Sequence, residues 1–577
     1  MALTWEMGKN NVQPGYYEST FSVKNTGTHA LNADWTIYFN QINPIFSAQT
    51  AADASLKIEW ITSTCHKIVP TAHYQSLEPG ETMKFTYRCR GSLTREAFAP
   101  EGAYIVMRDK KGNELTPQNI PIEVVPFTHS YQWSDSTEKF PYSDGKYVYE
   151  QNAFFSDSYK PDSTTIFLHP KSLVKSTRVS SFSKSVHLNY TSEFENEAVF
   201  IKEKLTAEFG CTVSENGETL VELKKLNTRE KYPDEYYEIS INNNNFNLAG
   251  VDAHGVFNAC QTLINLLENA GNLLSRIANL RIADYPDMEH RGLMLDVARN
   301  FTKKGNVLKL IDLLSSYKLN ERFKDSNILS YCWNTMPERG RDEVPYLLAN
   351  GGYPIVLCNV TNFYLDMCYC SHASEKGLSW GGYVNEYNTF DMLPYDIYKS
   401  IRQNLKGEPV DIFAVSKAKL PLSKAACIQI KGLQAQIWAE TIRSFDQVEY
   451  YLFPKIFGLV ERAWNAQPDW SLSTNNQKYE KAKKEYNSQI AFYELPRLAK
   501  RGANFRVAQP GVIIRNDSLY ANCTILEAVI RYTIDGSDPT ENSIVWTKPI
   551  PCNAKQVKAQ AFYLGKNSLT TVTDNEK

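Results

Sequence analysis

The sequence predicts a multidomain protein. It comprises an N-terminal β-sandwich, an α+β domain, a (β/α)8 TIM-barrel-type domain that is incomplete, with about four strands, and a small C-terminal β domain. The chain has 577 residues, enough for about three to five domains. Hydrophobic residues make up 42% and charged residues 22%, which is typical of globular proteins and excludes general disorder. Strand-like alternation dominates both ends of the chain, whereas strand and helix patterns alternate in its middle.

Composition also excludes several classes of partner. The 62 Lys and Arg residues balance 64 Asp and Glu residues, so nothing indicates binding to nucleic acid. No apolar stretch of about 18 residues is present, so we expect no membrane span. The N-terminal residues MALTWEMGKNN lack the basic and apolar regions of a signal peptide. Cys523 and Cys552 could pair, but spacing alone does not decide it.

Residues 1–127 read as the β-sandwich. Apolar side chains alternate in Trp35–Phe39 and again in Met83–Tyr87, which places one face of each strand in a core. Residues 128–283 form the predicted α+β domain. Its expected strands are 166–170 and 236–241, and its expected helices are 197–210, which ends at Gly210, and 256–271.

Residues 284–497 carry the barrel pattern. Four apolar runs read as buried parallel strands, and amphipathic helices are expected over 307–320 and 448–465. The remaining residues, 498–577, contain a turn of the Asp-Gly type and read as a small all-β domain. The four runs are GLMLDV (292–297), NILSYCW (327–333), YPIVLCNV (353–360) and GLQAQIW (432–438).

Four motifs carry a family resemblance. HRGLMLDVARNF (290–301), NVTNFYLDMCY (359–369), GLSWGGY (377–383) and GLQAQIWAETI (432–442) resemble glycoside hydrolase family 20, most of all the β-N-acetylhexosaminidases called exochitobiases. The flanking domains resemble that family's carbohydrate-binding, second and C-terminal domains. The resemblance implies release of terminal N-acetylhexosamine with retention, the sugar's own acetamido oxygen acting as nucleophile. It also implies no cofactor, no metal, and a periplasmic or extracellular location.

The resemblance implies roles for six residues that would bind a sugar. Trp333 is a further candidate wall of the site, whereas Asp296 and Arg299 read as a structural pair. Each of the six has an ordinary structural explanation when taken alone, and only their joint occurrence points to a site. The six are Arg291 and Asp366 for sugar hydroxyls, Tyr364 for the acetamido oxygen, Trp380 as a wall, Trp438 for stacking on the ring, and Glu440 for the outer hydroxyls.

The catalytic pair of the family is missing. Its acid and orienting residues lie in a His-x-Gly-Gly-Asp-Glu motif that this sequence lacks. Residues 321–327 are too few to hold the missing strands, because even one parallel crossover needs about a dozen residues. Asp342 and Glu343 are weak catalytic candidates; acidic residues before an apolar run more often begin a helix.

An incomplete barrel leaves alternatives open. Opening the barrel would expose two sheet edges and its apolar interior. The chain then folds around a rebuilt core, forms a homodimer through the opened barrel, or is part of a longer protein. The resemblance implies the function of a β-N-acetylhexosaminidase acting on N-acetylhexosamine-containing oligosaccharides or glycans. The alternative is a non-catalytic glycan-binding protein derived from such an enzyme.

Overall fold

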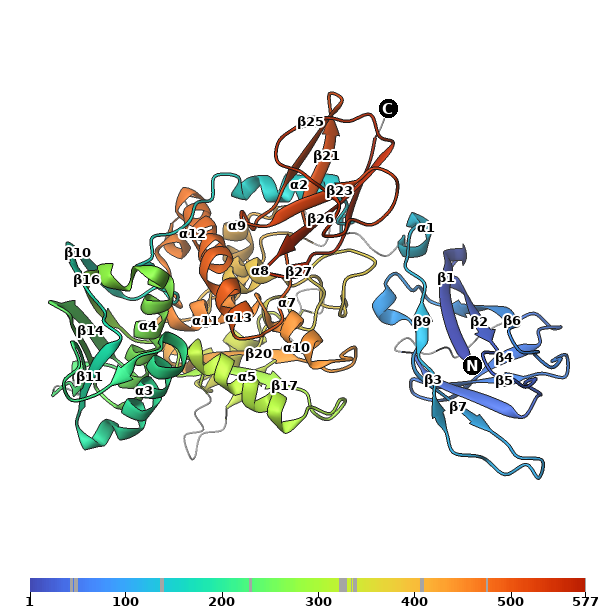
Figure 1. Cartoon of the computed structure of the whole chain (residues 1–577), viewed down its shortest axis with the longest axis horizontal. Coiled ribbons are helices and arrows are strands. Elements are labelled where there is room, and N and C mark those ends of the chain that lie inside the picture. Colours follow the sequence, from blue (N-terminus) through green and yellow to red (C-terminus); the bar gives the residue numbers. More distant parts are fainter. Residues whose placement is uncertain are drawn as a thin grey trace.

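The computed structural model describes the chain in four parts. It covers all residues except 42–44, 46–49, 135–139, 228–230, 321–328, 334, 336–339, 405–408, 474–475 and 576–577, and the side chains of 272, 273 and 275. Figure 1 shows the N-terminal domain on the right, the α+β domain on the left, the central domain between them and the C-terminal domain above it.

The N-terminal domain is the predicted sandwich of two sheets. Trp35, Ile37, Phe39, Phe85 and Tyr87 are all buried, so the expected alternation is confirmed. One sheet has the order β6-β2-β1-β9 and the other β4-β5-β3-β7-β8. The strands are β1 (Ala2–Gln13), β2 (Tyr16–Lys24), β3 (Trp35–Asn40), β4 (Leu56–Thr62), β5 (Cys65–Pro70), β6 (Thr82–Arg90), β7 (Glu101–Met107), β8 (Gln118–Asn119) and β9 (Ile122–Val124).

One residue of the central domain completes the core of the sandwich. Ala373 is 1% exposed and packs within the sandwich's apolar cluster. Its carbonyl accepts a hydrogen bond from the Glu96 backbone N–H at 3.0 Å. The two domains therefore share a core at this point.

The α+β domain is built on a seven-stranded mixed sheet covered by two helices. Helix α3 ends at Gly210, whose φ of 65° lies in the left-handed region that glycine adopts without strain. Asp252 caps α4 by accepting from the Gly255 N–H at 2.8 Å. The order is β10-β16-β14-β15-β13-β11-β12, with β10 (Ser172–Ser180), β11 (Ser185–Tyr190), β12 (Thr212–Val213), β13 (Thr219–Lys225), β14 (Tyr237–Asn242), β15 (Asn245–Gly250), β16 (Ile277–Asp284), α3 (Glu195–Phe209) and α4 (Ala253–Ala270).

One expectation for this part of the chain was wrong, and two helices that precede it contact other domains. Residues 166–170 form no strand. Ile166, Phe167 and Leu168 are buried as irregular chain in the core, so the apolar run reports burial rather than sheet pairing. The segment before them also lies elsewhere: α1 (Ser130–Trp133) packs beside β1, and α2 (Gly145–Asn152) packs on β21 (Gly511–Arg515) of the C-terminal domain (Figure 1).

The central domain contains the four predicted strands in one parallel sheet. They are β17 (His290–Leu295), β18 (Ser330–Cys332), β19 (Ile355–Leu357) and β20 (Ile430–Ile437), in the order β17-β20-β19-β18. Within the described residues this sheet does not close into a barrel. The first two strands along the chain, β17 and β18, are the edges of this sheet, and β20 and β19 between them are almost wholly buried.

Helices follow these strands along the chain. A helix was expected over 448–465, but Pro454 divides it into α10 and α11, since proline cannot donate to the preceding turn. The helices are α5 (Lys304–Ser316), α6 (Val344–Asn350), α7 (Val360–Phe363), α8 (Glu386–Phe390), α9 (Ile412–Lys417), α10 (Phe445–Leu452), α11 (Ile456–Trp464), α12 (Asn476–Gln489) and α13 (Leu495–Lys500).

Opening the sheet does not expose its centre. Leu433 and Ile437 of β20 are 0% exposed, so the middle of the sheet is covered, as expected if the chain folds around a rebuilt core. Apolar exposure lies instead on the helices that follow the edge strands. Leu308 and Ile311 of α5 are 55% and 57% exposed, and Leu347 of α6 is 57% exposed.

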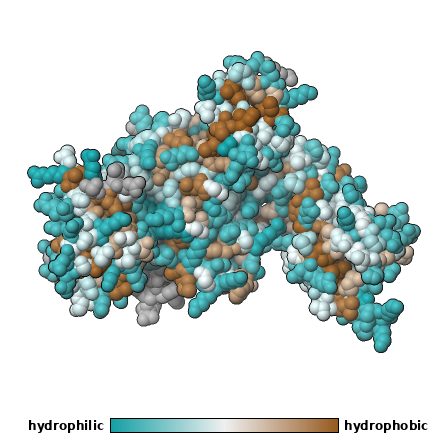
Figure 2. Space-filling view, viewed as in Figure 1, coloured by the Kyte–Doolittle hydropathy of each residue, from teal (hydrophilic) through white to brown (hydrophobic). Residues whose placement is uncertain are grey.

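The C-terminal domain is all-β, as predicted. Cys523 and Cys552 are both free thiols. Figure 2 shows an apolar strip over this domain at the top of the view. Ile534 and Ile544 are exposed apolar residues of the domain. No helix in the described part of the chain is long and apolar enough to span a bilayer. The other strands are β22 (Ser518–Asn522), β23 (Val529–Thr533), β24 (Ile544–Val545), β25 (Ile550–Pro551), β26 (Gln556–Tyr563), β27 (Lys566–Asn567) and β28 (Thr571–Asp574).

Candidate functional site

The candidate site lies at the carboxyl ends of β19 and β20. We call it the cradle and define it as Tyr364, Asp366, Trp380, Trp438 and Glu440. Parallel strands bring their carboxyl ends to one edge of a sheet, where sites of such folds form. The chain that follows β19 is joined there directly to β20, because the Leu365 N–H donates to the Gln436 carbonyl at 2.9 Å.

Tyr364 and Asp366 lie beyond the end of the strand that leads to the cradle. β19 ends at Leu357, and the short helix α7 precedes both residues. Tyr364 forms a single parallel bridge with Gln436. The bridge keeps the chain beside β20 after the strand itself has ended.

Aromatic rings form the walls of the cradle. The ring of Tyr364 lies 5.8 Å from that of Trp380 and 6.0 Å from that of Trp438, centroid to centroid. Trp333, the further wall candidate, lies edge-on to Trp438 at 5.2 Å. Trp333 and Trp380 are 41% and 49% exposed, so they present apolar faces to solvent on which a sugar ring could stack.

Asp366 is the buried carboxyl of the cradle. It is 2% exposed, and its Oδ1 accepts from the Trp438 backbone N–H at 3.2 Å. Its Oδ2 is buried without a hydrogen-bond partner in the described part of the chain. Burial raises the pKa of Asp366 to about 7. The carboxyl can therefore offer an oxygen or, when protonated, a proton to a bound hydroxyl.

A buried lysine fixes the backbone on either side of Asp366. Lys455, at the start of α11, is 0% exposed, and its Nζ donates to the carbonyls of Leu365 at 2.8 Å and Met367 at 2.6 Å. The ammonium also lies 3.7 Å from the centroid of the Tyr369 ring. Burial lowers the pKa of Lys455 to about 7. Nothing in the local sequence pattern indicates this contact.

Arg291 lies away from the cradle. It is at the amino end of β17, paired in register with Leu433, whereas the cradle lies at the carboxyl ends. Its side chain is 2% exposed and forms an ion pair with Glu235 of the α+β domain at 2.7 Å. Its Nε donates to the Lys318 carbonyl at 2.8 Å. This geometry makes Arg291 a contact between domains and not a ligand of the site.

Arg299 is the arginine that the structure brings to the cradle. Its guanidinium lies 5.2 Å from the ring centroid of Trp438 and its Nε 3.5 Å from Glu440 Oε1. The predicted pair with Asp296 is present at 2.7 Å, so Asp296 orients Arg299. A signal existed in the sequence: Arg299 follows the carboxyl end of the first strand, whereas Arg291 begins that strand.

Asp342 and Glu343 lie in another cluster. They directly precede α6, which begins at Val344, so the prediction of a helix start is confirmed. Asp342 pairs with Lys419 at 2.8 Å, and Glu343 accepts from the Leu420 N–H at 3.1 Å. No contact within the described residues joins either carboxylate to the cradle.

Comparisons with known proteins agree with this architecture. Four family models match in chain order: "Putative carbohydrate binding domain" over 11–139, "Glycosyl hydrolase family 20, domain 2" over 164–285, "Glycosyl hydrolase family 20, catalytic domain" in two pieces over 288–324 and 321–467, and "Chitobiase/beta-hexosaminidase C-terminal domain" over 509–573. The division of the catalytic-domain match falls where the sequence lacks the middle strands.

Individual relatives share only about a quarter of their residues with this chain over the matched parts. A β-hexosaminidase B of Pseudoalteromonas piscicida is 26% identical over 53% of this chain and 40% of its own length. An N,N'-diacetylchitobiase of Vibrio harveyi is 24% identical over 37% of this chain and 25% of its own length. The chain thus spans at most about two fifths of these curated relatives.

The fold has a solved counterpart. The crystal structure of a GH20 exo β-N-acetylglucosaminidase from Vibrio harveyi, in complex with N-acetylglucosamine, superposes with a TM-score of 0.59 at 14% identity. The match covers 88% of this chain and 99% of that one. With all four domains matched in order, the chain belongs to glycosyl hydrolase family 20.

Proposed function

We propose that this protein acts on terminal N-acetylhexosamine residues of oligosaccharides or glycans, with the activity of a β-N-acetylhexosaminidase. The observation that carries the proposal is the cradle: three aromatic rings and a buried carboxyl at one edge of the parallel sheet. Aromatic faces suit the apolar face of a pyranose ring, and fixed polar atoms suit its hydroxyls.

Each cradle residue takes a proposed role. Trp438 stacks on the sugar ring, and Tyr364 donates to the acetamido oxygen. Trp380 closes one side, while Asp366 and Glu440 accept from the hydroxyls. Arg299 replaces Arg291 as the cation of the site, since its planar fork lies beside Glu440 and Trp438.

Hydrolysis further requires a general acid. In a substrate-assisted reaction the acetamido oxygen attacks the anomeric carbon, and an acid protonates the leaving oxygen. Asp366 is already assigned to a sugar hydroxyl as an acceptor, so we do not propose the same carboxyl as this acid. Asp342 and Glu343 are held by Lys419 and Leu420 outside the cradle, and we propose no proton donor among the described residues.

The second candidate function is glycan binding without catalysis. It is favoured by the open four-stranded sheet. The aromatic rings of the cradle are present, but the sheet does not close into a barrel around them. Hydrolysis of p-nitrophenyl N-acetyl-β-D-glucosaminide by protein with an intact mass of 65.8 kDa separates the two functions. Turnover that D366N abolishes supports the hydrolase. Absent turnover with saturable quenching of tryptophan fluorescence by N-acetylglucosamine supports the binding protein, and absence of both overturns the proposal.

We further propose a homodimer through the open side of the sheet. Leu308 and Ile311 of α5 and Leu347 of α6 are more than half exposed, and these helices follow the two edge strands. Light scattering after size exclusion should give about twice the monomer mass, and I311D should return the monomer. A monomer at all concentrations would refute the dimer.

A periplasmic or extracellular site of action, where glycans occur, is likewise proposed, and cell fractionation tests it.

A further inference from the structure

A single loop carries two walls of the cradle. We call residues 364–384 the sugar-site loop, because Tyr364 and Asp366 begin it and Trp380 lies near its end. Its two arms are hydrogen-bonded to one another: the Cys368 N–H donates to the Leu378 carbonyl at 2.7 Å, and the Val384 N–H donates to the Cys368 carbonyl at 2.9 Å. A displacement at Cys368 therefore moves both Asp366 and Trp380.

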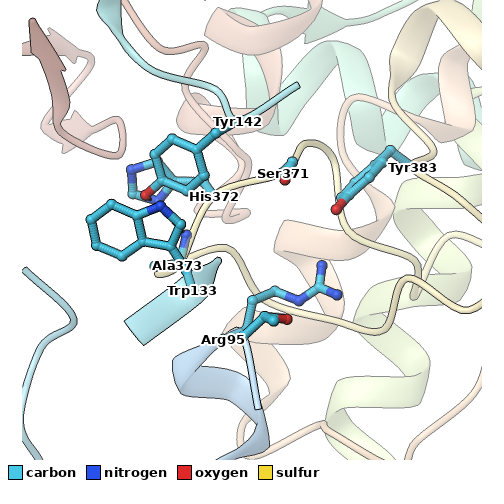
Figure 3. A pocket seen from close by; sticks show the side chains of 8 residues that line it. Arg95, Trp133, Tyr142, Ser371, His372, Ala373 and Tyr383 are labelled. Atoms are coloured by element: carbon cyan, nitrogen blue, oxygen red, sulfur yellow. Dashed lines mark hydrogen bonds between the residues drawn. The ribbon is translucent and has the colours of Figure 1, made fainter. Parts of the chain in front are cut away.

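An arginine of the N-terminal sandwich holds this loop at three points. Arg95, between β6 and β7, is 4% exposed. Its Nη1 donates to Cys368 Sγ at 3.0 Å, its Nη2 donates to Ser379 Oγ, and its guanidinium lies 5.8 Å from the ring centroid of Tyr383. Figure 3 shows the Arg95 side chain reaching from the sandwich toward Tyr383, beside the stacked rings of Trp133, Tyr142 and His372.

The chemistry of these contacts suits a fixed position. The Cys368 thiol is fully buried, and burial raises its pKa to about 11, so the sulfur accepts as a neutral thiol. A guanidinium is planar and rigid, so it can fix the separation of two acceptors in a way that a single ammonium cannot. Cys368 lies two residues after Asp366, and Ser379 lies directly before Trp380.

We propose that Arg95 is a positioning residue for the sugar site, so that the N-terminal sandwich sets the affinity of the cradle by holding the sugar-site loop. The sandwich then serves the site in another domain, whatever glycan it binds itself. The proposal deepens the proposed function and rests on it, because it takes the cradle to be the sugar site.

A matched control isolates this contact. Glu101 of the sandwich pairs with Arg443 of the central domain at 2.5 Å, and neither residue contacts the sugar-site loop among the described contacts. E101Q therefore weakens the junction of the same two domains and leaves the loop unchanged. R95M removes the three-point contact, and R95K restores the charge without the planar fork.

The test measures amide hydrogen exchange of the loop and the dissociation constant for N-acetylglucosamine by tryptophan fluorescence. R95M should speed exchange at Cys368 and Val384 and weaken binding about tenfold, while R95K should recover part of the affinity and E101Q should match the wild type. If R95M fails to fold, S379A, which removes one contact from the loop side, should weaken binding about threefold.

The outcomes separate this proposal from the proposed function. Wild-type protein that binds no sugar refutes the proposed function, and the exchange data still decide whether Arg95 holds the loop. Unchanged loop exchange and unchanged affinity in folded R95M overturn the positioning role. Equal effects of R95M and E101Q on both readouts also overturn it, since they would reflect general loosening of the domains.

Discussion

The backbone N–H of Trp438 donates a hydrogen bond to Oδ1 of Asp366 at 3.2 Å. This bond joins the chain that leaves β20 to the sugar-site loop that follows β19, and it aligns Oδ2 as the remaining acceptor of the carboxyl. Replacing Asp366 tests whether that oxygen serves a sugar. D366N should weaken binding of N-acetylglucosamine by about ten- to a hundredfold, because a hydrogen bond to a charged group contributes about 1.5–3 kcal/mol. D538N, at the exposed Asp538–Lys558 pair, is the control in the fluorescence titration.

Asp366 should also give the protein a pH-dependent stability. Its pKa rises from 3.8 to about 7 on folding, so between these values the native state binds more protons than the unfolded state. The free energy of unfolding therefore falls as the pH rises through this window. D366N lacks this loss, so its stability relative to the wild type should increase from pH 4.5 to 7.5 in urea titrations. A constant difference across that range would contradict the shift.

Lys455 should affect the same site from outside it. K455M removes the donor to the Leu365 and Met367 carbonyls and should lower the affinity for N-acetylglucosamine about tenfold, since the backbone around Asp366 is released. K455R keeps the charge and should retain more affinity than K455M. Wild-type affinity in folded K455M, measured by the same titration, would show that the loop holds its shape without the lysine.

The two arginines of the first strand region should behave in opposite ways. R291M leaves Glu235 buried without its cation and should lower the free energy of unfolding by about 3–5 kcal/mol. R299M changes a side chain that is half exposed, so its stability should change by less than about 1 kcal/mol while sugar binding weakens. Paired urea unfolding and fluorescence titration of both variants provide the test, and loss of binding in a fully stable R291M would restore Arg291 to the site.

The acidic pair before α6 should be dispensable for chemistry. D342N and E343Q should bind sugar, and turn over substrate if the wild type does, within about twofold of the wild type, because their partners are Lys419 and Leu420. A fall in turnover of about a hundredfold or more in either variant would identify it as the general acid.

The strands of the central sheet were predictable because each is a short apolar run bounded by turns or charges. Parallel strands that are covered on both faces have nearly continuous apolar sequences, so such runs predict them. β17, β18, β19 and β20 all appear where expected. The same signal misled at 166–170, where the chain is buried without pairing. An apolar run reports removal from water, and pairing depends on neighbours that lie far away in the sequence.

The cradle was predictable only where its residues follow a strand closely. Trp438 and Glu440 come directly after β20, so their position followed from the strand itself. The contacts of Arg95 with Cys368 and of Lys455 with Leu365 span 273 and 90 residues and leave no periodic trace. Arg291 was assigned to the wrong end of its strand, since a resemblance names residues without giving their depth in the sheet.

Ala373 has a consequence for how this protein can be divided. Its methyl group completes the sandwich core from another domain, and its carbonyl is bonded to the chain beside Arg95. A sandwich expressed alone would lack this methyl group and leave a space of that size among apolar side chains. The remaining chain would expose Ala373 to solvent. The two pieces therefore depend on each other for packing, and a sandwich expressed alone would expose apolar surface that the intact protein keeps covered.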